Sequence, residues 1–169
     1  MSRFEELRHA YLDARKDFFA RRDASAAFAA TIVEGMEHYL ECPPFQVHFI
    51  SNTREASATK AHNALGAVWL GTDSNWHFNI GLDLIDNEEG FRKDAARQTV
   101  VFELLVQPSD SGFNVGIKGW NDRFSLPGTD GTAERAAFYD FVFQHITGSY
   151  QQPGQRFFEN GVDPQRAIG

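Results

Sequence analysis

The segment from residue 76 to residue 84 alternates strictly between apolar and polar side chains. Because neighbouring side chains of a β-strand point to opposite faces, such a segment builds a strand with one apolar and one polar face. Strands of this kind are typical of antiparallel sheets, which bury one face and leave the other in water. We therefore expect an antiparallel sheet whose core face includes Trp76, Phe78, Ile80, Leu82 and Leu84.

Other segments have the alternation or the bounding turn residues of strands, and they follow one another closely enough to form a meander. The turn-forming residues 71–75 and 108–111 predict two hairpins, and Asn121 with Asp122 suits a tight turn into a short last strand. The sequence thus predicts about six antiparallel strands, at residues 45–50, 64–70, 76–84, 99–107, 112–120 and 123–126.

The residues before the first strand have a helical period instead. Intervals of three and four predict a helix at residues 2–21 with one buried stripe, formed by Phe4, Leu7, Tyr11, Ala14 and Phe18. A second pattern at residues 23–41 predicts another helix, with Asp23 in the N-cap position and two prolines at 43–44 after its end. We expect two N-terminal helices, and a single long helix through Asp23 is the open alternative.

The chain after the strands predicts one more helix, which is largely buried. It opens at residues 130–132, carries apolar side chains on more than a narrow stripe between 138 and 146, and has Gly148 placed to end it. The charged residues 86–96 are compatible with a short helix, and residues 149–169 have the composition of an irregular tail.

Together these elements predict an α+β fold with two N-terminal helices, a meander of about six strands, and one C-terminal helix packed on the sheet. We expect one domain at residues 1–148, followed by a tail at residues 149–169. The order of elements resembles that of the helix-grip lipid-binding fold and that of small acidic secretion chaperones. No sequence motif accompanies this resemblance, so it implies an architecture alone.

The charge of the chain restricts its partners. It carries 16 Lys and Arg against 23 Asp and Glu, a net charge of −7, so most of its surface would repel the phosphates of nucleic acid. Its single cysteine, Cys42, has no second cysteine with which to form a disulfide, and no apolar stretch is long enough to span a bilayer. We expect a cytoplasmic protein that binds neither nucleic acid nor membranes.

The polar face of the predicted sheet holds the candidate ligand-binding residues, which are His48, His77, Asn79, Asp83, Glu103, Lys118 and Trp120. Alternation places this face in water, where Ala substitution of His77, Asp83 or Glu103 is expected to change stability by no more than about 0.5 kcal/mol. None of these residues is assigned a catalytic role.

Neither a metal nor a cofactor is expected. No two histidines have the i, i+4 spacing of a zinc peptidase helix, and there is no cysteine cluster. The glycines at 112, 116 and 119 fall within a predicted strand and lack the strand-to-helix context of a phosphate-binding loop. Cys42, which precedes two prolines, suits a buried helix end better than an activated thiol.

Two functions remain open. The sequence favours a non-enzymatic binding module for a protein partner or an apolar small ligand. The alternative is a small hydrolase or isomerase in which histidine and carboxylate groups of the polar face act as acid and base. Unpaired sheet edges also make a homo-oligomer possible.

Overall fold

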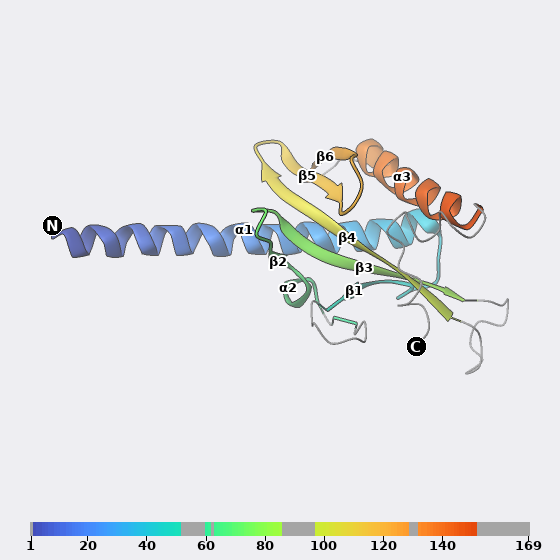
Figure 1. The fold of residues 1–169 in the computed structure, drawn as a ribbon, viewed down its shortest axis with the longest axis horizontal. Helices are drawn as coiled ribbons and strands as arrows, with labels where there is room; N and C mark the ends of the chain where they lie inside the picture. The colour runs from blue at the N-terminus through green and yellow to red at the C-terminus, as the bar shows by residue number, and fades with distance from the viewer. Residues whose placement is uncertain (1, 52–59, 62, 86–96, 129–131, 152–169) are drawn as a thin grey trace.

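The computed structural model describes residues 2–51, 60–61, 63–85, 97–128 and 132–151. Six strands form one antiparallel sheet in the order β1–β3–β4–β5–β6, and β2 pairs with β3 beside β1. Figure 1 shows the two long helices packed against this sheet. The predicted α+β class, antiparallel sheet and C-terminal helix are confirmed. The elements are α1 (Arg3–Leu40), β1 (Val47–Ile50), α2 (Ala64–Ala67), β2 (Trp69–Leu70), β3 (Trp76–Ile85), β4 (Arg97–Ser109), β5 (Gly112–Ile117), β6 (Arg123–Pro127) and α3 (Thr132–Gln151).

The core lies between the apolar face of the sheet and the helices α1 and α3. The predicted burial of Trp76, Phe78, Ile80 and Leu82 is confirmed, whereas Leu84, near the end of β3, is 37% exposed. Helix α1 adds Phe28, whose ring stacks on that of Phe113 in β5 at a centroid distance of 4.1 Å. Helix α3 adds Phe138, which meets Phe124 of β6 edge-on at 5.3 Å. Aromatic contacts therefore fix both helices on the sheet.

The prediction of two N-terminal helices is wrong, because α1 continues through Arg22 and Asp23 without a break. The residues that follow are mostly alanine, the strongest helix former, and neither glycine nor proline occurs in α1 before Gly35. Ser2 and Glu5 form a reciprocal capping box at the start of α1. The helix ends at Leu40, and the C-cap residue Glu41 has a left-handed backbone conformation with φ of 51°.

The prediction of a strand at residues 64–70 is also wrong. Asn63 caps the short helix α2 by accepting a hydrogen bond from the Gly66 backbone, and the strand β2 has only two residues. Strand β1 pairs with residues 79–82 on the same edge of β3. Only the start of β3, at residues 76–77, is left on that edge for pairing with β2, so β2 is short.

Several predicted ends differ from the structure, two of them by three residues or more. Strand β5 ends at Ile117 rather than at residue 120, since the chain turns at residues 118–119, where Gly119 has a positive φ of 85°. Helix α3 extends to Gln151, so Gly148 lies inside it and does not end it. The predicted helix at 86–96 and the predicted tail beyond Gln151 lie outside the described residues, and the domain boundary stays a prediction.

The first half of α1 projects beyond the sheet (Figure 1). We call residues 3–22 the arm. Every residue of the arm except the half-buried Arg22 is exposed, including Phe4 at 76%, Leu7 at 72% and Tyr11 at 61%. The predicted stripe on this helix exists, but the prediction that the protein's own core buries it is wrong.

Candidate functional site

The polar face of the sheet contains a cluster centred on His77. Its ring nitrogens lie 2.7 Å from two carboxylate oxygens, Nδ1 from Glu103 of β4 and Nε2 from Asp73 in the turn before β3. The Lys118 ammonium group donates to the second oxygen of Glu103 at 2.8 Å. The Trp69 indole stacks on the imidazole at a centroid distance of 5.5 Å. His77 thus links the turn, β3 and β4.

This cluster holds the His77 ring rather than leaving it available for proton transfer. Only 7% of His77 is exposed, so the prediction that it faces water is wrong. Hydrogen bonds from Asn75, then from His77, hold the pKa of Asp73 well below its usual range, so Asp73 is an ionised acceptor. The absence of a side chain at Gly71 makes room for the ring, because a Cβ there would overlap Nε2 of His77.

A second cluster surrounds Asp83, further along β3. Asp83 is 7% exposed, so its predicted position in water is also wrong. Its carboxylate accepts hydrogen bonds from the Thr99 hydroxyl at 2.6 Å and the Lys60 ammonium group at 3.0 Å. Burial opposes ionisation of Asp83, but these bonds and the neighbouring charges of His48 and Lys60 outweigh it and lower the pKa. The buried Asp83 thus joins β3 to β4 by a hydrogen bond and to the segment at Lys60 by an ion pair with an exposed ammonium group.

His48, on β1, lies beside this second cluster without joining it. Its Nδ1 atom is 3.9 Å from the Asp83 carboxylate and, among the described residues, has no hydrogen-bond partner. Burial lowers the pKa of His48, with the Asp83 charge opposing that shift. The ring therefore favours its neutral form in the folded protein.

The predicted site residues do not converge on one pocket. His77, Glu103 and Lys118 belong to the first cluster, while Asp83 belongs to the second with His48 beside it. Asn79 lies on β3 between His77 and Asp83 and is half-buried. Trp120 lies beyond β5 and stacks on His145 of α3 at 4.4 Å, so it belongs to the helical side of the molecule.

Two further observations concern metal binding and the single thiol. Among the side chains that the structure describes, no group of three or more His, Cys, Asp and Glu is placed to hold a metal ion. Burial, together with the charge of Glu37, raises the pKa of the Cys42 thiol, whose Sγ lies 3.7 Å from the Glu37 carbonyl oxygen. A raised pKa keeps this thiol protonated and weakly nucleophilic.

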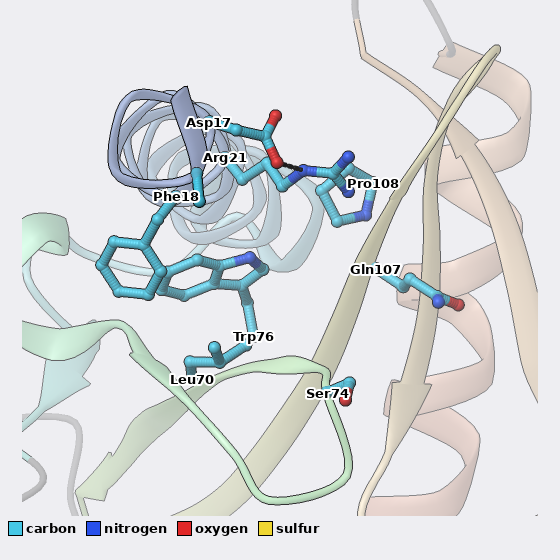
Figure 2. A pocket seen from close by; sticks show the side chains of 9 residues that line it. Asp17, Phe18, Arg21, Leu70, Ser74, Trp76, Gln107 and Pro108 are labelled. Atoms are coloured by element: carbon cyan, nitrogen blue, oxygen red, sulfur yellow. Dashed lines mark hydrogen bonds and ion pairs between the residues drawn. The ribbon is translucent and has the colours of Figure 1, made fainter. Parts of the chain in front are cut away.

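A surface that the sequence did not predict lies where the arm leaves the sheet. A cavity of about 260 Å³ opens there between α1 and the ends of β2, β3 and β4. Figure 2 shows the Phe18 ring against the Trp76 indole, at a centroid distance of 5.3 Å, with Leu70 and Pro108 on the sheet side. Arg21, at the rim, is paired with Asp17 at 2.8 Å.

The arm continues the buried face of α1 past this cavity. At 100° per residue, Leu7, Tyr11 and Phe18 lie within about 60° of the buried residues Ser25, Ile32 and Met36 around the helix axis. One apolar stripe therefore follows the whole helix. Its C-terminal half is covered by the sheet and α3, and the half on the arm is exposed apart from the contact of Phe18 with Trp76. We call Phe4, Leu7, Tyr11, Ala14 and Phe18 the arm stripe.

Comparison with known proteins adds no relative: the chain matches no family model, no curated protein and no solved structure. Among the helices of the described residues, none has the length and apolar composition of a membrane span.

Proposed function

We propose that the protein is a non-enzymatic binding module and that its arm stripe is the surface that binds a protein partner. The observation that carries this proposal is the exposure of the arm stripe in line with a face that is core elsewhere on the same helix. A contiguous exposed apolar surface favours an interaction site. An amphipathic helix that lays its apolar side into a groove is a recurrent mode of protein recognition.

A protein partner is favoured over an apolar small ligand. Small-molecule pockets enclose about 300–1,000 Å³ and bury most of the ligand. The cavity beside Trp76 has about 260 Å³, and the arm stripe extends from it over about 21 Å of helix between Phe4 and Phe18. A surface of that length suits a polypeptide better than a small molecule.

The alternative of a small hydrolase or isomerase has weaker support. Both ring nitrogens of His77 already face carboxylates, and His48 is not hydrogen-bonded to Asp83. A general base needs a free nitrogen within reach of a substrate proton. This arrangement, found among the described residues, favours the binding module over the enzyme.

Site-specific photo-crosslinking tests the proposed function. A photoreactive residue replaces Leu7 on the arm stripe or, as the matched control, Asp13, which lies about 140° from the centre of the stripe on the same helix. We expect a discrete protein adduct from position 7 and none from position 13 in cells that express the protein. The adduct partner, once purified, should bind the Leu7→Asp variant at least 10-fold more weakly and the Asp13→Asn variant normally.

The proposal is wrong if positions 7 and 13 give the same adducts or if neither gives one. It is also wrong if the purified adduct partner binds the wild type and Leu7→Asp equally.

A further inference from the structure

The spacing of the residues in the arm stripe indicates that its partner is a helix. Its five residues follow one another at intervals of three, four, three and four, the heptad seam by which two helices pack side by side. Because the seam is only about two heptads long, its apolar contacts alone give a weak pairing. The charges beside the seam therefore have a large share in choosing the partner.

Those charges are not mixed evenly around the arm. On a helical projection, five arginines lie within about 80° of the centre of the stripe: Arg3, Arg8, Arg15, Arg21 and Arg22. The four acidic residues of the arm lie about 100° or more from that centre: Glu5, Glu6, Asp13 and Asp17. Glu5, Glu6 and Asp13 thus face away from the stripe, whereas Asp17 lies at the cavity, where it is paired with Arg21. Apart from this pair, arginine borders the surface that would meet a partner.

One border of the stripe is a regular row of arginines. Arg8, Arg15 and Arg22 recur every seven residues, at the positions that flank a heptad seam. The guanidinium groups of Arg15 and Arg22 lie 5.6 Å and 4.8 Å from the centre of the Phe19 ring, which holds both on this side of the arm. Arg22 is also paired with Asp23 at 2.7 Å, so a partner with carboxylates at the matching flank would meet this row chiefly at Arg8 and Arg15.

A second copy of the chain does not supply such a flank. Antiparallel pairing of two arms would put Arg8 of one arm beside Arg15 of the other, and parallel pairing would put Arg8 beside Arg3. Both arrangements bring arginines together, which opposes pairing. Parallel pairing would also put Arg22 beside Asp17, which offsets part of this repulsion without supplying a row of carboxylates.

A flat membrane surface fits the arm poorly as well. The sheet lies on the side to which the stripe points, because the same stripe becomes the buried face of α1. A plane laid along the stripe would meet the end of the sheet at Trp76 and Pro108. A single helix alongside the arm avoids this obstacle, since it can end at the cavity there.

We propose that the partner segment is an acidic amphipathic helix, with an apolar seam bordered by Glu or Asp, that pairs with the arm stripe and places an apolar side chain in the cavity beside Phe18 and Trp76. This inference rests on the proposed function and adds the chemistry of the partner. The arm has six basic and four acidic residues, whereas the rest of the chain has 10 and 19, so the arm is the basic part of an acidic protein.

Two synthetic peptides test the inference with the full chain. Each has three heptads with Leu at both seam positions; one carries Glu at both flanking positions and the other carries Lys. We expect the Glu peptide to bind at least 10-fold more tightly than the Lys peptide by fluorescence anisotropy, and its affinity to fall as salt increases. Leu7→Asp should abolish binding, and the matched control Asp13→Asn should not change it.

A charge reversal gives the decisive comparison. In the double variant Arg8→Glu, Arg15→Glu the preference should invert, with the Lys peptide binding more tightly. The inference is overturned if neither peptide binds, if both bind alike, or if the double variant keeps the preference for the Glu peptide. Self-association through Leu7, seen by sedimentation, would overturn this inference and leave the proposed function standing, whereas failure of crosslinking at position 7 would overturn the proposed function itself.

Discussion

The contact between Gly35 of α1 and Tyr139 of α3 tests how closely the two helices must approach. A Cβ atom at Gly35 would overlap the Tyr139 hydroxyl oxygen and lie 3.0 Å from Cζ of the same ring. Tyr139 is buried, and its hydroxyl has no hydrogen-bond partner among the described residues. The substitution Gly35→Ala therefore forces a buried ring to move or the helices to separate.

The expected magnitude follows from two opposing effects. Alanine is favoured over glycine inside a helix by about 0.8–1 kcal/mol. Overpacking a well-filled core costs about 1–3 kcal/mol. Gly35→Ala should therefore lower the free energy of unfolding by up to about 2 kcal/mol. Tyr139→Phe should raise it by about 1 kcal/mol, because a buried hydroxyl without a partner is removed.

The double variant separates these effects. Without the hydroxyl the nearest ring carbon lies at 3.0 Å, a distance that a small shift relieves, so Gly35→Ala should be neutral or stabilising in the Tyr139→Phe background. Urea denaturation followed by circular dichroism measures all four proteins. Gly148→Ala is the control, because a Cβ there meets no atom within 4 Å and should add about 0.5–1 kcal/mol. An equal cost of Gly35→Ala in both backgrounds would refute the reasoning.

Other substitutions and the pH test the polar clusters and the arm. Asp83→Ala should lower the free energy of unfolding by about 1.5–3 kcal/mol, because it removes a buried charged acceptor. Both Asp83 and His48 have lowered pKa values in the folded state. The unfolded chain therefore binds more protons, and urea midpoints should fall as pH drops below about 6.5 for His48 and again below about 4 for Asp83; constant midpoints from pH 7 to pH 3 would contradict both assignments. Leu7→Glu should change the free energy of unfolding by less than about 0.5 kcal/mol, whereas Phe28→Ala should lower it by about 3–5 kcal/mol. Similar losses in the two variants would mean that the arm is part of the cooperative core.

The sequence could predict features that depend on a local period. The alternation from Trp76 to Leu82 was sufficient to place that side of β3 in the core, because only two faces are possible for a strand. The hairpin between β4 and β5 followed from the turn residues near Asp110. The helical period likewise identified which arm residues share a side.

A local period cannot show whether another element buries the apolar face that it predicts. The stripe at Leu7 has the spacing of a buried face, and only the length of the sheet relative to α1 shows that it is in water. The burial of His77 depends on carboxylates from a turn and from a neighbouring strand, so no local pattern contains it. The short helix α2 had one local signal, the cap at Asn63, which outweighed the apolar run after it.

The continuity of α1 couples the direction of its exposed half to the position of its buried half. Within a single unbroken helix the angle between Phe18 and Phe28 is set by the number of residues between them, at about 100° for each residue. One residue inserted between them would turn the arm stripe by about 100° away from the cavity, while seven would return it to within about 20° of its original direction. The number of residues between Phe18 and Phe28, and not only their composition, therefore determines which way the arm stripe faces.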